Sequence, residues 1–314
     1  MGRWLAAALA SAMASVVGLI LVVAVAAGST GATGPTDSGS PATSGSAGGS
    51  GPSAARQSAP AVPTAWATLY RQAASRCAGL DWSVLAAIGT VETGNGSSTL
   101  PGVWSGANAA GAEGPMQFEP ATFAAYAVLG PGGARPPSPY DPIDAVYTAS
   151  ALLCADGAGS PAGLRSAIGS YNHSEVYVDT VLTLSLALQQ DPDTSGTVVA
   201  ALSFAAAQLG TPYLWGGTGV GGFDCSGLVQ AAYRHAGIEL PRVAQDQFDA
   251  GPPVATGQAL TPGDLVFFGS GPGGVEHVGL YVGAGEMIDA PHTGALVRFD
   301  DADWPDRVGA TRPA

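Results

Sequence analysis

The chain has 314 residues, a formal net charge of −13 at pH 7 and a sequence pI of about 4.4. This length is enough for about two domains of typical size. Lys and Arg together number 11 against 24 Asp and Glu, so no basic patch is available to meet the phosphates of a nucleic acid. The composition therefore excludes nucleic acid as a partner.

Residues 1–27 predict an export segment. Arg3 gives this segment a positive start, and residues 4–27 carry no charge. The uncharged run exceeds the roughly 20 residues with which a helix crosses a bilayer, which favours a transmembrane anchor with Arg3 on the cytoplasmic side. The alternative is a cleaved signal peptide, because the Ala-Val-Ala at 24–26 has the small residues that precede a cleavage site. In either case we expect the rest of the chain outside the cytoplasm, membrane-anchored or secreted.

Residues 28–61 predict a flexible linker. They are nearly all Gly, Ser, Thr, Ala and Pro, with almost no large apolar side chain. Such a stretch cannot bury enough apolar surface to offset the entropy that it would lose on ordering. We therefore expect two folded domains after the linker, at 62–191 and 195–314.

The segment 62–191 predicts a helical domain, because it has long runs of Ala and Leu, breaks at Gly and Pro, and few strand signals. Asp81 is placed to cap a helix that ends near Glu92, before the turn residues "TGNG". Glu92 lies beside the apolar stripe of this helix. A carboxyl group held against apolar surface is biased toward its protonated form, which a general acid requires. The final run of this segment, "VYVDTVLTLSLALQQ", is predicted as a helix because it is too long for an average strand.

Three cysteines are too few to pair completely. Cys77 and Cys154 both lie in the helical segment, and Cys225 lies well beyond it. Disulfides persist outside the cytoplasm, and a bond between Cys77 and Cys154 would be worth about 4–5 kcal/mol in the chain-entropy model. Cys225 would then be a free thiol, either a reactive group or a small buried apolar residue.

The segment 195–314 predicts helices followed by a sheet. A helical pattern over 197–210 precedes a glycine-rich loop, and a second helix begins at Cys225 and ends at Gly237. The unpaired N–H groups and the dipole at the start of this helix favour a thiolate. The short runs "GDLVFFG", "HVGLYVG", "EMIDA" and "ALVRF" predict the strands of an antiparallel sheet.

His277 opens the second of these strands. Its imidazole could take the proton of the Cys225 thiol and later protonate a leaving group. Asp289 closes the next strand and is the predicted third residue that orients the imidazole, with His292 as the rival. The alternative is that these four side chains are mixed zinc ligands. Closely spaced ligand pairs such as C-x-x-C are missing, so we expect no metal and no other cofactor.

Four stretches of this segment, "YLWGGTGVGGFDCSGLVQ", "LPRVAQDQF", "GDLVFF" and "HVGLYVGAGEMIDAP", resemble the NlpC-type papain-like cysteine peptidases of bacterial cell walls. The resemblance covers residues 195–314. It implies an α+β papain-like fold with a central antiparallel sheet. It also implies cleavage of peptidoglycan stem peptides between D-isoglutamate and the diamino acid at the third position.

The resemblance assigns roles residue by residue. Cys225 matches the nucleophile, His277 the base, and Asp289 the third polar position, where family members often have histidine. Residues expected to bind the stem peptide are Tyr213, Asp224 and Ser226. Asp224 corresponds to an acidic residue that would meet the free amine of the stem peptide's L-alanine.

The helical segment also carries a resemblance. "AGAEGPMQFEPATF" and "SYNHSEVYVDTVL" resemble the lytic transglycosylase and goose-type lysozyme superfamily. This implies an all-α lysozyme-like domain in which Glu92 protonates the glycosidic oxygen and then acts as base toward the muramyl 6-hydroxyl. Residues expected to position the sugar are Gln117, Tyr171 and Asn172.

A lysozyme-type hydrolase stays open as the alternative, and it needs a second carboxylate. Glu113 and Glu119 are the candidates, although both lie near the Met-Gln motif, where loop and helix-capping roles are expected.

Taken together, the sequence predicts a two-domain peptidoglycan hydrolase that cuts glycan strands and stem peptides. Its expected partners are peptidoglycan, the membrane through the first helix, and wall-remodelling or conjugation machinery by analogy alone. Two other functions remain open: a muramoyl-alanine amidase that uses the same cysteine, and a wall-binding scaffold without activity.

Overall fold

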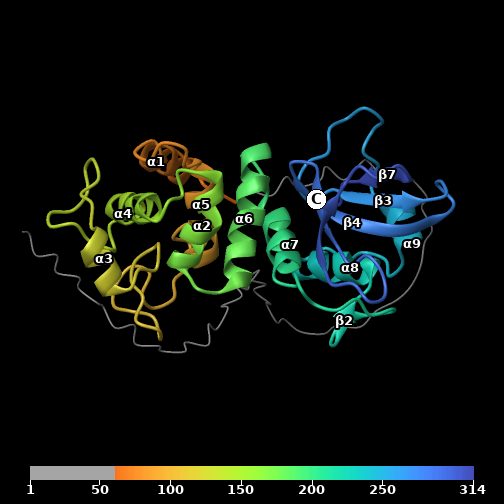
Figure 1. Cartoon of the computed structure of the whole chain (residues 1–314), viewed down its shortest axis with the longest axis horizontal. Helices are drawn as coiled ribbons and strands as arrows, with labels where there is room; N and C mark the ends of the chain where they lie inside the picture. The colour runs from red at the N-terminus through yellow and green to blue at the C-terminus, as the bar shows by residue number, and fades with distance from the viewer. Residues whose placement is uncertain (1–60) are drawn as a thin grey trace, which may run out of the picture. The chain divides into compact units, whose positions relative to one another are not determined.

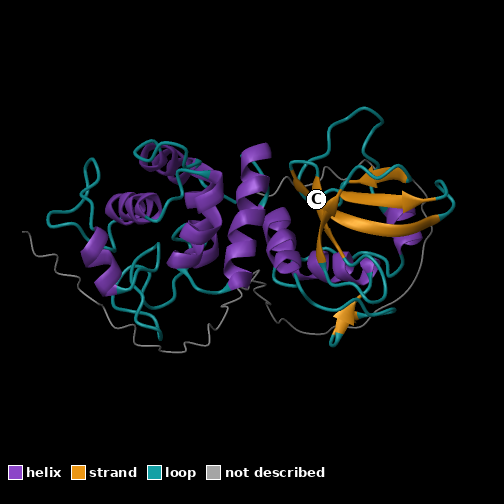
Figure 2. Cartoon of the chain, viewed as in Figure 1, coloured by secondary structure: helices purple, strands orange, loops and turns teal. Residues whose placement is uncertain are grey.

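The computed structural model describes residues 61–314, and the predicted export segment and nearly all of the predicted linker lie outside this range. Within it, none of the helices combines the length and the apolar character needed to cross a membrane. The part up to residue 191 is helical, and the part beyond it combines helices with a sheet (Figure 2). This matches the predicted order of secondary structure.

Six helices build the first part (Figure 1): α1 (Thr64–Ala74), α2 (Trp82–Thr93), α3 (Pro120–Tyr126), α4 (Pro142–Ala155), α5 (Pro161–Tyr171) and α6 (Glu175–Gln190). Helix α2 is the central one, because it packs against α1, α4 and α6. Seven of its twelve residues from 83 to 89 are buried in succession. The end of α2 is therefore held firmly, and it is this end that carries Glu92.

The helix boundaries follow from local capping. Asp81 accepts a hydrogen bond from the Ser83 backbone N–H at 2.9 Å, as an N-cap residue does. Gly94 ends α2 in the left-handed conformation, with φ of 58°. Ser174 caps α6 in the same way as Asp81 caps α2. The predictions of α2 with its cap, and of a helix rather than a strand in the last run, are confirmed.

A disulfide joins Cys77, just after α1, to Cys154 in the last turn of α4, with 5.7 Å between the Cα atoms. The expected pairing is therefore present in the structure. Cys225 is free. Its thiol is half-buried rather than sealed in a core, so it differs from the small buried apolar residue that was the alternative.

The second part contains three helices and seven strands: α7 (Gly196–Ala206), α8 (Cys225–His235), α9 (Ala244–Ala250), β1 (Thr218–Gly219), β2 (Gly222–Phe223), β3 (Leu265–Gly269), β4 (Val275–Gly283), β5 (Glu286–Asp289), β6 (Arg298–Asp301) and β7 (Arg307–Thr311). Strands β1 and β2 form a small hairpin within the predicted glycine-rich loop. The other five form an antiparallel sheet in the order β6-β5-β4-β3-β7. Helix α8 packs on α7 and on β4.

The prediction of a strand over 295–299 is wrong in its first half. Strand β6 begins only at Arg298. The preceding residues pair instead with the segment before the glycine-rich loop, where the Tyr213 N–H donates to Ala295 and the Val297 N–H donates to Thr211. The apolar run is a run of extended backbone, as its pattern indicates, but its first residues bond outside the sheet. Helix α9 and strand β7 were not predicted.

The two faces of the sheet belong to different apolar clusters. Side chains such as Phe267, Leu280 and Ile288 join the large core that includes α8. The other face carries a small cluster of Val266, Phe268, Tyr281, Met287 and Ala302, with Leu260 and Trp304 packed against it.

His277 and Asp289 belong to the face with the small cluster. His277 is the register partner of Phe268, and Asp289 follows Met287 by two residues. Because strand side chains alternate between faces, both polar side chains extend from that face.

Candidate active sites

The start of α8 places the thiol. Asp224 is the N-cap residue, and its Oδ1 accepts a hydrogen bond from the Gly227 N–H at 2.7 Å. Cys225 is therefore the first residue of a helix of eleven residues. A thiol at this position meets the N–H groups and the positive end of the helix dipole. The sequence prediction of its position is confirmed.

The structure brings His277 together with Asp289. The Nε2 atom of His277 is 2.7 Å from Oδ2 of Asp289, and the two side chains are 14% and 0% exposed. Cys225 is close enough to His277 to raise the pKa of the imidazole, and Nδ1 is the ring nitrogen that the bond to Asp289 leaves free. His292 is exposed, and its Nδ1 lies 3.1 Å from the Thr293 carbonyl oxygen. Asp289 rather than His292 is thus the group that holds the ring.

The charges of the pair keep the imidazole protonated. Burial lowers the pKa of His277, but the hydrogen bonds to Asp289 and Cys225 and the charges of both groups raise it by more, from 6.5 to about 9. Burial also raises the pKa of Asp289, against the effect of its bond to His277. The second oxygen of this carboxylate, Oδ1, is buried without a hydrogen-bond partner. An imidazolium beside a thiol is the arrangement that stabilises a thiolate.

The predicted binding residues Asp224 and Ser226 are joined through a guanidinium group. The Nη2 and Nη1 atoms of Arg242 donate to Asp224 at 2.6 and 2.9 Å, and Nη1 also donates to the Ser226 hydroxyl at 2.9 Å. Asp224 accepts a further bond from the Gly216 N–H at 2.9 Å. The prediction did not include Arg242, although it closes the quoted "LPR". Asp224 thus fixes the start of α8 and its preceding loop.

Tyr213 lies at the same site. Burial raises the pKa of its hydroxyl, and the charges of Cys225 and Asp224 raise it further, while Arg242 lowers it. Tyr213 is half-buried, so part of its side chain is open to solvent. The structure therefore gathers the three predicted binding residues of the second part around the thiol.

Glu92 forms the centre of a second site, in the helical part. Its Oε1 accepts a hydrogen bond from the Tyr177 hydroxyl of α6 at 2.7 Å. Burial raises the pKa of Glu92 to about 7, and the bond from Tyr177 works against this rise. Tyr177 was predicted only as part of the final helix of this segment. Its functional placement was missed because the contact joins residues 85 positions apart in the sequence.

The other predicted residues of the helical part have different surroundings. The Tyr171 hydroxyl donates to the Met116 carbonyl at 2.6 Å, and Tyr171 is close enough for Glu92 to raise its pKa, after the larger effect of burial. Gln117 has a φ of 50° and donates to the Gly114 carbonyl at 2.7 Å. Asn172 is exposed and accepts from the Ser174 N–H. Tyr171 is thus near Glu92, while the amides of Gln117 and Asn172 hold their own loops.

Neither candidate second carboxylate joins Glu92. Glu113 raises the pKa of Tyr140, where burial is the larger cause, and its backbone pairs with Phe118. Glu119 stands at the N-cap position of α3, but its side chain makes no capping bond. The expected loop role of Glu113 fits the structure, whereas the capping role of Glu119 is limited to its position. Only burial and Tyr177 act on the pKa of Glu92.

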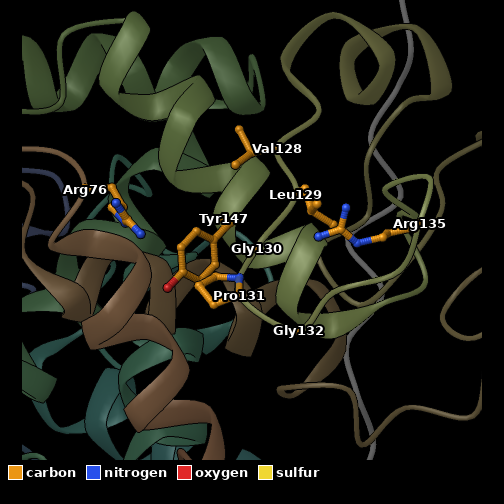
Figure 3. A pocket seen from close by; sticks show the side chains of 8 residues that line it. All are labelled: Arg76, Val128, Leu129, Gly130, Pro131, Gly132, Arg135 and Tyr147. Carbon is orange, nitrogen blue, oxygen red and sulfur yellow. The ribbon is translucent and has the colours of Figure 1, made fainter.

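A cavity of about 500 Å³ lies apart from both sites (Figure 3). It is lined by Arg76, Val128, Leu129, Gly130, Pro131, Gly132, Arg135 and Tyr147. Arg76 comes before α2, whereas Glu92 is at the far end of that helix. The sequence predicted no function for these residues, and none of the predicted site residues lines the cavity. Between residues 61 and 314, no cluster of three or more His, Cys, Asp or Glu side chains could hold a metal ion.

Comparison with known proteins identifies a family for part of this chain. The NlpC/P60 family model matches residues 210–307. The chain is 45% identical over 106 residues to a gamma-D-glutamyl-L-lysine dipeptidyl-peptidase of Bacillus subtilis (strain 168), covering 33% of this chain and 36% of the relative. It is 50% identical over 105 residues to the bifunctional muramidase/DL-endopeptidase CwlT of the same organism, covering 32% and 31%.

Solved structures match the same part of the chain. RipD of Mycobacterium tuberculosis, described as a non-catalytic NlpC/p60 domain protein, is 32% identical, with 38% of this chain and 98% of that chain covered and a TM-score of 0.33. The chain spans about a third of the length of the curated relatives named above. The match of the family model lies within the predicted domain 195–314. Residues 210–307 therefore form a domain of the NlpC/P60 family, with its papain-like fold.

Proposed function

We propose that the chain is a bifunctional peptidoglycan hydrolase that cuts stem peptides at Cys225 and glycan strands at Glu92. The observation that carries the first activity is the free thiol beside the buried His277–Asp289 pair, 2.7 Å between Nε2 and Oδ2. A cysteine peptidase needs a thiolate, a proton carrier and a group that orients the carrier. All three side chains come together here from α8, β4 and β5.

The peptidase reaction follows from this arrangement. The Cys225 thiolate attacks the carbonyl carbon of the bond between D-isoglutamate and the diamino acid. The imidazolium of His277 gives its proton to the leaving amine, which leaves a thioester on Cys225. His277 then takes a proton from water, and the hydroxide hydrolyses the thioester. Asp289 keeps the imidazole in place throughout.

Recognition of the stem peptide falls to Tyr213, Asp224 and Ser226. Asp224 is already paired with Arg242 at 2.6 Å, so a free amine of L-alanine would share this carboxylate with a guanidinium. An uncut stem joined to muramic acid has no such amine. Recognition at this position therefore favours endopeptidase activity over the amidase alternative.

The glycan activity rests on one carboxyl group. With a pKa raised by burial to about 7, Glu92 keeps a protonated population at neutral pH and can protonate the glycosidic oxygen. The same carboxylate then takes the proton of the muramyl 6-hydroxyl as this oxygen attacks the anomeric carbon, and an anhydro sugar results. Neither Glu113 nor Glu119 is among the groups that shift the pKa of Glu92, which favours a lytic transglycosylase over a hydrolase that needs two carboxylates.

Location and partners complete the proposal. The enzyme would work outside the cytoplasm, held by the segment 1–27 as a membrane anchor or released after its cleavage. The linker 28–61 would let both domains reach into the wall. A partner in wall-remodelling or conjugation machinery is proposed by analogy alone.

The test is a digest of purified peptidoglycan with the full chain, analysed by mass spectrometry. Wild type should release both cut stems and anhydro-muramyl ends. Cys225→Ala should lose only the cut stems and Glu92→Gln only the anhydro ends, whereas the matched control Glu119→Gln should keep both. Reducing ends in place of anhydro ends would turn the second activity into a lysozyme type. Intact peptidoglycan under reducing and oxidising conditions would favour the scaffold function.

A further inference from the structure

The imidazole of His277 is enclosed by two aromatic rings. Its ring centre lies 5.6 Å from that of Trp304, with only 19° between the ring planes. Phe268 lies 5.9 Å from His277 and 4.9 Å from Trp304. Phe268 comes from β3, opposite His277 in register, and Trp304 comes from the turn between β6 and β7. The three rings therefore form one cluster over the sheet face that carries the pair.

We propose that Trp304 is a positioning residue for the peptidase site, whose indole ring fixes the plane of the His277 imidazole and keeps water from its bond to Asp289. This inference rests on the proposed function of His277. Trp304 touches neither the thiol nor the carboxylate in this assignment. It acts through the imidazole.

Burial supports this role. The side chain of Asp289 is fully buried and that of His277 is 14% exposed. Trp304 is half-buried and packs against the small cluster on the same face of the sheet. A hydrogen bond between charged groups is stronger where water is excluded. The buried Oδ1 of Asp289 has no hydrogen-bond partner, so this carboxylate holds the imidazole through a single bond, from Oδ2 to Nε2.

The nearly parallel stacking of Trp304 on His277 has a second effect, which is to stabilise the charged imidazole. An indole face attracts a cation placed over it, and the protonated imidazole is such a cation. The charged groups that act on His277 are Cys225 and Asp289, and those that act on Asp289 beyond it are Asp300 and Arg298. Trp304 carries no charge. Its loss should destabilise the imidazolium through loss of the ring face, without a change of charge at the site.

The experiment compares Trp304→Leu, Trp304→Phe and the control Trp104→Leu, an exposed tryptophan of the helical part, in the full chain. The NMR titration of His277, assigned by its disappearance in His277→Gln, reports the imidazole without any substrate. In Trp304→Leu the midpoint should fall by about one pH unit, as expected for a desolvated cation–π contact. The kcat on a soluble stem peptide with a free L-alanine should fall about tenfold, with KM within about twofold. Trp304→Phe should restore most of both values, and Trp104→Leu should change neither.

Two results would overturn the proposal. One is a Trp304→Leu variant with the wild-type midpoint and kcat. The other is a loss of kcat with an unchanged midpoint in both Trp304 variants, which would indicate a merely structural residue; thermal unfolding of each variant identifies such destabilisation. If wild type cleaves no stem peptide while the midpoint still responds to Trp304→Leu, the proposed function fails and the effect of Trp304 on the imidazole stands.

Discussion

The two candidate sites use burial in opposite ways. At Glu92, burial favours the neutral acid and raises the pKa to about 7, against the lowering effect of the hydrogen bond from Tyr177. At His277, burial favours the neutral base, and the pKa rises to about 9 only because Asp289 and Cys225 outweigh it. An isolated carboxyl group becomes a general acid by being buried, whereas a histidine needs charged neighbours to remain an acid. The helical site can therefore rest on one residue, and the peptidase site cannot.

The largest expected effect is the loss of one of the two activities without the other. His277→Gln removes the proton carrier of the peptidase site, so stem-peptide cleavage should fall by about 10³-fold or more. Release of anhydro-muramyl ends should not change, because Glu92 shares no contact with His277. Quantitative mass spectrometry of one digest measures both. Equal loss of the two products would mean that the sites depend on each other, and the comparison would fail.

The next effect tests the neighbour on which His277 depends. Asp289→Asn keeps a hydrogen-bond acceptor but removes the negative charge, so stem-peptide cleavage should fall about 10–100-fold. The lost carboxylate also raised the pKa of His277, so the alkaline limb of kcat/KM should move below pH 9.

Asp289→His is the matched variant, because family members often have histidine there. It should retain more activity than Asp289→Asn. An unchanged alkaline limb in both variants would contradict the assignment of this limb to His277.

The third effect is a difference in pH dependence between the two activities of the wild-type chain. The protonated form of Glu92 is lost as the pH rises through about 7, so glycan cleavage should fall about tenfold per unit at higher pH. The imidazolium of His277 persists to about pH 9, so stem-peptide cleavage should continue. Initial rates of both reactions in one pH series should cross over between these values. A parallel decline of the two rates would show that one event, such as unfolding, limits both.

How much the sequence could predict depended on how far apart in the chain the interacting residues lie. The cap at Asp81, the helix start at Cys225 and the strands around His277 and Asp289 follow from residues close together in the chain, and the structure has them. Several contacts between distant segments were missed, although the disulfide between Cys77 and Cys154 was predicted. Tyr177 reaches Glu92 from another helix, Arg242 reaches Asp224 across 18 positions, and Trp304 lies outside every motif.

The strand predicted over 295–299 shows that a local pattern cannot specify the segment with which it pairs. Its apolar pattern indicates extended backbone, and the backbone is extended. The pattern does not contain the identity of the partner strand, because any extended segment can supply the same N–H and C=O groups. The Tyr213 segment takes the first residues of the run away from the sheet. Register and partner choice are properties of the whole fold.

The smallest expected effect sharpens the account of Glu92. The bond from Tyr177, 2.7 Å long, lowers the pKa of this carboxyl against the effect of burial. Tyr177→Phe removes the bond and keeps the ring, so the pKa should rise further above 7, and the alkaline limb of glycan cleavage should move to higher pH. The maximal rate should change only about two- to fivefold, since one hydrogen bond is worth about 1 kcal/mol. Tyr140→Phe is the matched control, because its hydroxyl bonds the Gly106 carbonyl rather than Glu92. A limb that moves to lower pH in Tyr177→Phe would mean that the hydroxyl stabilises the protonated acid, and burial alone would no longer explain the raised pKa.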